Sequence, residues 1–232
     1  MHISSEPAIL YLGTPVVLIS TTNEDGSFNL APMSSAFWLG WRCMLGLAAA
    51  SKTTENLLRT GECVLNLPCD AMAPAVDRLA RTTGSDPVPA SKQRRGYVHE
   101  SDKFGISGLT PVASQTVAPP RVLECPVQLE AKLESRHKLA EDDAKLRGGI
   151  IVFEVRVQRA HIEQSILVDD DPNRIDPDKW RPLIMSFQKF YGLASRQLHA
   201  STLAQIPEAL YRSPDVDRAR AASTVPGMPV LP

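Results

Sequence analysis

Runs and alternations of apolar side chains predict most of the strands in this chain. Residues 16–21 and 63–67 are continuous apolar, β-branched runs, which are typical of buried strands. Residues 127–134 and 153–158 alternate apolar with polar side chains, which predicts strands with one buried face and one solvent-exposed face. A further apolar run covers residues 43–50. The pattern therefore predicts a mainly β chain built from antiparallel strands.

Turn and helix signals separate these strands. Residues 23–26 contain an Asp-Gly step, and glycine supplies the positive φ that a tight hairpin turn requires. A capping residue at Ser51 and a glycine at Gly61 predict a short helix between the strands. Apolar side chains at helical spacing predict a second helix over residues 70–82. We thus expect a β fold with a few helices.

Polar segments interrupt the pattern in three places. Residues 82–102 are rich in Pro, Lys and Arg, and a structureless stretch of about 20 residues inside a domain is either a functional lid or disordered. Residues 169–173 predict a turn or loop. The segment after Tyr211 is rich in Pro, Ala and Arg, and we expect it on the surface or on a partner subunit. These boundaries predict one domain over residues 1–211 and a C-terminal tail over residues 212–232.

Length and charge narrow the class of protein. The 232 residues suit a single β-barrel or sandwich domain. The chain has 25 basic and 26 acidic residues, whereas a duplex-binding protein carries a clustered positive excess. Its apolar runs are too short to span a membrane, and its first residues lack the basic and apolar regions of a secretory signal. We expect a cytoplasmic protein that binds neither nucleic acid nor membranes.

Motifs for covalent, metal or P-loop chemistry are missing from the sequence. The chain has no GxGxxG, GxxxxGK[ST], GxSxG or HExxH pattern. Its four cysteines form no CxxC pair, so we expect reduced thiols and neither a disulfide framework nor a metal site. The acidic run at 169–171 lacks the spaced glycine and terminal glutamate of an EF-hand loop and is better explained as a solvated turn. No catalytic acid, base or nucleophile is predicted.

Small hydroxyl and amide residues gather around the first predicted helix. One set lies where a helix N-terminus presents unpaired N–H groups to an anion such as a phosphate: Ser51, Thr53, Thr54 and Asn56. A second set on the preceding strand and hairpin could hydrogen-bond the heteroatom edge of a planar ring: Thr21, Thr22, Asn29, Ala31, Pro32, Met33, Ser34 and Ser35. Taken alone, each set is also explained by a helix cap or a turn.

The order of the two sets along the chain resembles one known family. The segments GTPVVLISTTNEDGSFNLAPMSSAFWLGW and ASKTTENLLRTGECVLNLP are similar to the flavin-reductase-like family of FMN-binding split barrels. That family includes flavoredoxins and the reductase components of two-component monooxygenases. The matching positions are Asn29, Pro32, Ser34, Ser35, Thr54, Asn56, Asn66 and Leu67. With a later similar segment, DKFGISGLTPVAS, the resemblance covers about residues 10–195.

This resemblance implies an antiparallel FMN-binding split β-barrel that forms a homodimer, with flavin near the subunit interface. The phosphate of FMN, or of FAD, would lie at the set from Ser51 to Asn56, with Lys52 adding charge, and residues 29–35 would face the ring and ribityl chain. NAD(P)H would be the reductant, and an oxygenase component could receive the reduced flavin. Two alternatives stay open: an FMN-retaining flavoprotein that carries electrons or acts on another small substrate, and a non-enzymatic flavin-binding protein.

Other positions allow two interpretations each. Lys92, Arg94 and Arg95 belong either to a lid drawn to the phosphates of NAD(P)H or FAD, or to a solvated loop. Trp38 and Trp41 either border the flavin ring or pack in the core or the dimer interface. Many family members carry an Arg-Gly-Gly-like stretch before a late tyrosine. Here residues 185–187 read Met-Ser-Phe instead.

Overall fold

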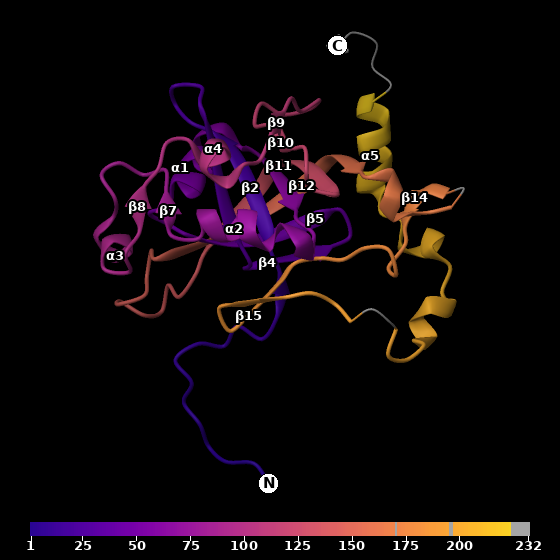
Figure 1. Cartoon of the computed structure of the whole chain (residues 1–232), viewed down its shortest axis with the longest axis horizontal. Helices are drawn as coiled ribbons and strands as arrows, with labels where there is room; N and C mark the ends of the chain where they lie inside the picture. The colour runs from indigo at the N-terminus through magenta and orange to yellow at the C-terminus, as the bar shows by residue number, and fades with distance from the viewer. Residues whose placement is uncertain (170, 195–196, 224–232) are drawn as a thin grey trace.

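A seven-stranded antiparallel sheet forms the centre of the molecule (Figure 1). The computed structural model describes residues 1–169, 171–194 and 197–223. The strands of the sheet are β2 (Val17–Thr22), β3 (Phe28–Met33), β4 (Ala36–Leu39), β5 (Arg42–Ala48), β6 (Glu62–Leu67), β11 (Val127–Lys138) and β12 (Ile150–Ile162). Their order is β3-β2-β6-β11-β12-β5-β4, so among the described residues the sheet is not closed. The predicted mainly β, antiparallel architecture is confirmed.

Helix α1 (Lys52–Thr60) begins and ends where its sequence predicts. Ser51 is the N-cap, and its Oγ accepts a hydrogen bond from the backbone N–H of Thr54 at 3.1 Å. Gly61 ends the helix with a φ of 69°, a left-handed conformation that glycine adopts without a Cβ clash. Its N–H donates to the carbonyl of Leu57 at 2.9 Å. The connection between β5 and β6 is therefore a short, capped helix.

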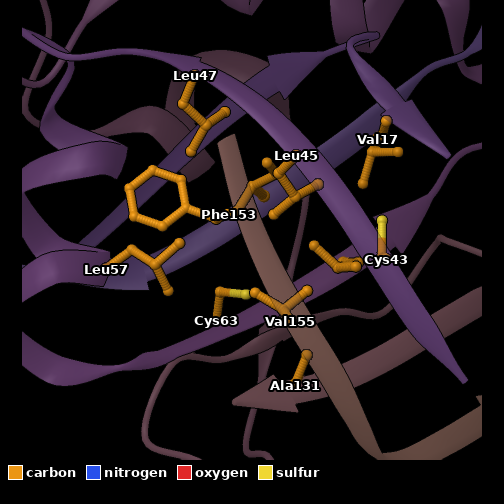
Figure 2. Close-up of a cluster of buried hydrophobic side chains, with 12 residues drawn as sticks. Val17, Cys43, Leu45, Leu47, Leu57, Cys63, Ala131, Phe153 and Val155 are labelled. Atoms are coloured by element: carbon orange, nitrogen blue, oxygen red, sulfur yellow. The ribbon is translucent and has the colours of Figure 1, made fainter. Parts of the chain in front are cut away.

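One hydrophobic core lies between α1 and the inner face of the sheet (Figure 2). Its fully buried side chains include Val17, Cys43, Leu45, Leu47, Leu57, Cys63, Ala131, Phe153 and Val155. On β12 the fully buried Phe153 and Val155 are separated by the half-buried Glu154, as the alternating pattern predicts. Burial raises the pKa of the Cys43 thiol to about 12, so it packs as a neutral, apolar group.

A second core covers the other side of β2 and β3. It is closed by α2 (Ala73–Leu79) and α4 (Lys103–Ser107), and it includes Leu18, Leu30 and Phe104. The helix predicted over residues 70–82 is divided into a 3-10 turn, η1 (Asp70–Met72), and α2. The helix ends early because the chain then enters the short strand β7 (Thr82–Thr83).

The segment 82–102 is ordered, which corrects the prediction of a structureless stretch. Strand β7 pairs in parallel with β8 (Val98–His99), and α3 (Ala90–Gln93) lies between them. The N–H of Val98 donates to the carbonyl of Arg81 at 3.1 Å, and the N–H of Tyr97 donates to that of Lys92 at 3.1 Å. Strands of two residues are too short to show apolar periodicity, so the sequence pattern could not reveal them.

Shorter elements complete the described part of the chain. They are β1 (Thr14–Pro15), β9 (Pro111–Val112), β10 (Arg121–Val122), η2 (Gln164–Ile166), β13 (Leu167–Val168), β14 (Asp171–Ile175), β15 (Ile184–Ser186), β16 (Lys189–Tyr191), η3 (Thr202–Gln205) and η4 (Glu208–Tyr211). The turn predicted over residues 169–173 is wrong for residues 171–173, which belong to β14 because they pair with β13, and residue 170 lies outside the described residues. No helix among the described residues is long and apolar enough to cross a membrane.

The segment predicted to be a C-terminal tail contains a helix, α5 (Pro214–Ser223), which lies beside β12 (Figure 1). Asp215 receives hydrogen bonds from Arg42 Nε at 3.0 Å and from Arg218 Nη1 at 2.6 Å. Proline and acidic residues in the first turn favour a helix start. The tail was predicted from the content of Pro, Ala and Arg, which does not take the positions of these residues into account. Residues 224–232 of the predicted tail lie outside the described residues.

Candidate functional site

A pocket of about 350 Å³ lies between the start of α1, strand β3 and the segment from β7 to β8. Most of the predicted cofactor residues line it: Asn29, Ala31, Pro32, Met33, Ser35, Ser51, Lys52 and Thr53. The structure therefore brings the strand set and the helix set of the sequence analysis together around one hollow.

The N-terminus of α1 forms one wall of this pocket. Lys52 and Thr53 are the first two helical residues, so their backbone N–H groups have no intrahelical acceptor and lie at the positive end of the helix dipole. Thr53 Oγ1 accepts a hydrogen bond from Asn29 Nδ2 at 3.1 Å, which leaves its own hydroxyl proton free to donate. Such a group of donors suits the phosphate of a ligand.

A buried hydrogen-bond network supports this wall from behind. Asn56 Nδ2 donates to Thr21 Oγ1 at 3.0 Å and to Asn23 Oδ1 at 2.8 Å. Thr54 Oγ1 donates to the carbonyl of Ala48 at 2.8 Å. Thr21, Thr54 and Asn56 are fully buried and do not line the pocket, so they hold α1 against β2 and β5.

Two other predicted site residues are also away from the pocket lining. Thr22 lies at the end of β2, and its buried Oγ1 has no hydrogen-bond partner among the described residues. Ser34 is half-buried in the connection between β3 and β4. Its neighbour Ser35 does line the pocket.

Two lysines form the wall opposite α1. Lys92 Nζ donates to Thr83 Oγ1 at 2.9 Å, and Lys103 Nζ donates to Thr82 Oγ1. Burial, with a smaller contribution from Lys92, lowers the pKa of Lys103 to about 8. Lys92 belongs to the segment that the sequence analysis considered as a lid, and the structure places it in the pocket with Arg95 and Tyr97. Arg94 does not line the pocket.

Lys103 is a pocket residue that the sequence analysis missed. It is the first residue of α4, where a positive charge is unfavourable for the helix dipole. The sequence contains this unfavourable charge as a signal, but a single lysine at the start of a helix is too common to identify a site. Its approach to the pocket depends on the packing of α4 against α2.

Gly84 keeps the two walls close together. A Cβ atom added at this position would lie 2.6 Å from Asn29 Oδ1 and 3.2 Å from Lys52 Cγ. Only a residue without a side chain lets the backbone after β7 approach the start of α1 this closely. The sequence analysis did not identify Gly84, since the contact joins segments far apart in the chain.

The two tryptophans that the sequence analysis considered as neighbours of the flavin ring lie away from the pocket at α1. Trp38 and Trp41 line a separate groove of about 440 Å³ together with Leu129 and Val157. Phe104 and Phe190 belong to the second core. Residues 185–187, where the family pattern differs, form the end of β15 and the turn into β16.

A larger hollow of about 810 Å³ lies beside β12, β14 and α5. Two arginines on its wall are already paired, Arg174 with Glu208 at 2.8 Å and Arg212 with Asp217 at 2.5 Å. Two further arginines, Arg159 and Arg220, also line it, so charge alone does not distinguish this hollow from the pocket at α1. None of the predicted cofactor residues lines the hollow, and we therefore place the candidate site at α1.

Comparison with known proteins identifies the family. Residues 10–194 match the sequence model described as "Flavin reductase like domain". The uncharacterised protein YdfE of Bacillus subtilis (strain 168) is 39% identical over 189 residues, which cover 81% of this chain and 87% of that protein.

Solved structures show the same fold. Flavoredoxin of Desulfovibrio vulgaris (Miyazaki F) has a TM-score of 0.68 at 22% identity, over 88% of this chain and 100% of that chain. Nitrilotriacetate monooxygenase component B from Bacillus cereus has a TM-score of 0.65 at 17% identity, over 82% of this chain and 88% of that chain. The predicted split-barrel fold is thus confirmed, and the match over residues 10–194 shows that the chain belongs to the flavin-reductase-like family.

Proposed function

We propose that this protein binds FMN in the pocket at the N-terminus of α1 and reduces it with hydride from NAD(P)H. The observation that carries this proposal is the meeting of helix N–H groups, small polar side chains and lysines around one pocket in a member of the flavin-reductase-like family. An oxygenase component is the partner that we propose for the reduced flavin, since a structural neighbour is a monooxygenase component B.

The chemistry of the pocket fits a phosphorylated flavin. At one end, the N–H groups of Lys52 and Thr53 and the hydroxyl of Thr53 are donors suited to a phosphate. Elsewhere, Ala31, Met33 and Ile150 supply apolar surface, which suits a planar ring.

Bound flavin supplies the two-electron redox chemistry. The protein then contributes binding and orientation. The N-terminus of α1 holds the phosphate, and residues of β3 orient the ring. The hydrogen bond from Asn29 to Thr53 links these two walls, so a change at one residue shifts the other. FAD would use the same phosphate site with its second half outside it.

We also propose a homodimer. Leu10 and Leu12 in the N-terminal segment and Phe37 and Leu39 in β4 are large apolar side chains exposed on the single chain. Burying them against a second copy would remove apolar surface from water. Light scattering in solution should give twice the mass of the 232-residue chain, and a monomer would contradict this proposal.

A second candidate function is an FMN-retaining electron carrier. The likeness to a flavoredoxin favours it, as does the enclosure of the pocket by the segment from β7 to β8. The two functions differ in their reaction with nicotinamide nucleotides. Tightly retained FMN that neither NADH nor NADPH reduces would favour the carrier.

The test is anaerobic mixing of purified protein, FMN and either NADH or NADPH, followed by the loss of the visible absorbance of flavin. We expect reduction faster than without protein for at least one nucleotide. Thr53→Val should weaken FMN binding by about tenfold, because a hydrogen bond to a charged group is lost. Thr60→Val, at the other end of α1 and outside the pocket, is the matched control. FMN binding that is equal in both variants would contradict the proposed site.

A further inference from the structure

Two hollows adjoin each other on the side of the molecule that carries α5 and β14 (Figure 1). We call the groove of about 440 Å³ beside Trp38 and Trp41 the tryptophan groove, and the hollow of about 810 Å³ beside α5 the arginine hollow. Both are lined by Trp41, Ala160 and Asn173, so they meet at these residues. Neither shares a lining residue with the pocket at α1.

The tryptophan groove has an apolar lining. Leu129 of β11, Val157 of β12 and Ile175 of β14 contribute to its walls. Trp38 and Trp41 add two aromatic surfaces, and the N–H of Val157 donates to the carbonyl of Trp41 at 2.9 Å, which fixes the backbone there. Among the described residues no charged side chain lines the groove. A concave apolar surface of this size suits the body of a small molecule.

Buried donors without an acceptor are concentrated around the two hollows. In the described part of the chain, four buried side-chain polar atoms have no hydrogen-bond partner, and three of them are found here. Nε1 of Trp38 belongs to the groove, and Nε of Arg159 belongs to the hollow. Oγ of Ser213 lies beside Gly40 of the groove, where an added Cβ would be 3.8 Å from it. Since folded proteins pair nearly all buried polar groups, this concentration indicates a polar ligand.

The arginine hollow has more positive charge than its own carboxylates compensate. Two of its four arginines form the ion pairs described above. Within the described ranges, Arg159 and Arg220 form no salt bridge, and nor does the exposed Asp171, whose Oδ1 accepts the N–H of Asn173 at 3.0 Å. Two unpaired cations and one unpaired carboxylate leave a single positive charge, which matches a monoanion.

Arg159 is the arginine best placed to hold this anion. It is half-buried on β12, next to Ala160, where the hollow meets the groove. Burying part of a guanidinium without an acceptor is unfavourable, because the charged donor loses water and gains no hydrogen bond. The planar guanidinium matches a carboxylate, which can accept two parallel hydrogen bonds from it. A carboxylate bound at Arg159 would therefore lie at the edge of the apolar groove.

We propose that the two hollows together bind a small amphipathic carboxylate, with its apolar body in the tryptophan groove and its carboxylate paired with Arg159. Arg220, exposed on α5, adds positive charge at the same hollow. This site lies apart from the pocket at α1, and the inference does not depend on flavin binding.

The test compares 2-naphthoate with 2-naphthylmethanol, which has the same ring system but no charge. Isothermal titration calorimetry of the full chain should show about tenfold tighter binding of 2-naphthoate, because a charge-assisted hydrogen bond forms with its carboxylate. Arg159→Gln should remove this difference by weakening the binding of 2-naphthoate alone. Arg159→Lys keeps the charge without the planar donor group and should recover part of the affinity. Absence of 2-naphthoate binding, or equal weakening of both ligands in Arg159→Gln, would overturn the proposal.

Three further variants locate the bound ligand. Arg156→Gln is the matched control for Arg159→Gln, since Arg156 is on the same strand, pairs with Glu134 and lines neither hollow. It should change neither affinity. Ala160→Leu adds bulk where the hollows meet and should weaken both ligands. Thr53→Val alters the pocket at α1 and should change neither. Loss of 2-naphthoate binding in Thr53→Val, or unchanged binding of both ligands in Ala160→Leu, would overturn the proposal.

Other occupants of the groove would give different results. If a second copy of the chain covered it, 2-naphthoate would lower the mass measured by light scattering. If residues 224–232 filled it, a variant ending at Ser223 would bind 2-naphthoate and the full chain would not. Either result would overturn the proposal. We expect an unchanged mass and equal binding by the full chain and the shortened variant.

Discussion

Among single residues, Glu130 shows how a buried charge is stabilised in this fold. Its carboxylate is fully buried on β11 and accepts hydrogen bonds from the N–H groups of Gln115 and Thr116 at 2.8 and 2.6 Å. His161 Nε2 lies 2.8 Å from the same carboxylate. Burial alone would raise the pKa of Glu130, but the hydrogen bonds from His161 and Thr116 and from the backbone outweigh it and lower the pKa to about 2.

This lowered pKa predicts an acid-sensitive contribution to stability. Because the carboxyl of an unfolded chain titrates near 4.5, the contribution is present above that pH and is lost as the pH falls toward 2. Its size is about 3 kcal/mol. Glu130→Gln should therefore be destabilised at neutral pH, and its difference from wild type should shrink as the pH falls. Urea unfolding at several pH values measures this, and a constant difference would contradict the assignment.

Site residues could be predicted from the sequence where they belong to a local pattern, and not where their position depends on contacts between distant segments. Ser51, Thr53 and Asn29 could be identified because they lie on local capping and hairpin patterns that the sequence displays. Lys103 and Gly84 could not, because their place in the pocket depends on contacts between distant segments. Thr21 and Asn56 were identified with the site but lie behind it, since sequence does not show which side of a buried residue faces a pocket.

At the scale of elements, α1 is the clearest link between local sequence and site. Ser51 Oγ accepts from the N–H of Thr54 at 3.1 Å and donates to Thr54 Oγ1 at 2.9 Å. The first residues of α1 and its cap therefore have three roles: they start the helix, they connect β5 to β6, and they form the wall of the pocket that we propose binds phosphate.

Removal of this cap should have two effects. Ser51→Ala leaves the N–H of Thr54 without its acceptor and should lower the free energy of unfolding by about 1 kcal/mol. It should also weaken FMN binding, because loss of the cap loosens the first turn of α1, whose N–H groups form the proposed phosphate site. Ser51→Asp is the comparison: it retains the cap but places a negative charge at the site. Normal stability with strongly weakened FMN binding in Ser51→Asp would separate the two roles, whereas unaltered FMN binding in both variants would contradict the site.

Helix α5 is held to strand β5 of the central sheet by charge. Asp215 is 6% exposed and pairs with Arg42, which also pairs with Glu154 of β12. Asp215→Asn should weaken this contact and increase hydrogen exchange in α5, with β12 less affected. Arg174→Gln, which breaks the exposed pair with Glu208, is the control and should leave exchange in α5 unchanged. Equal protection of α5 in wild type and Asp215→Asn would show that the ion pair does not hold the helix.

The helices and strands that could be predicted from the sequence are those long enough to display a pattern. Strands β2, β5, β6, β11 and β12 and helix α1 are long or capped enough to show a pattern, and they were predicted within a few residues. Strand β4 has four residues and was not predicted, and β3 was considered only as part of a hairpin. Strands β7 and β8 have two residues each, so the segment between them was misjudged as structureless. Helix α5 begins with a Pro-Asp signature, but its composition resembles a tail.

At the scale of the whole molecule, the fold of the family places several elements around one pocket, which is where we propose that the reaction takes place. The open sheet places β3 beside the start of α1, and the segment from β7 to β8 completes the enclosure. The charges around the pocket are positive, although the chain as a whole has a net charge of -1. Local charge, rather than total charge, therefore indicates the anionic ligand.

The most direct test of this account is a crystal structure of the protein with FMN. We expect the phosphate at the first N–H groups of α1, with the ring in the part of the pocket lined by Ala31, Met33 and Ser35. FMN bound elsewhere, such as in the groove beside Trp38 and Trp41, would contradict the proposed site, as would the absence of bound FMN at saturating concentration.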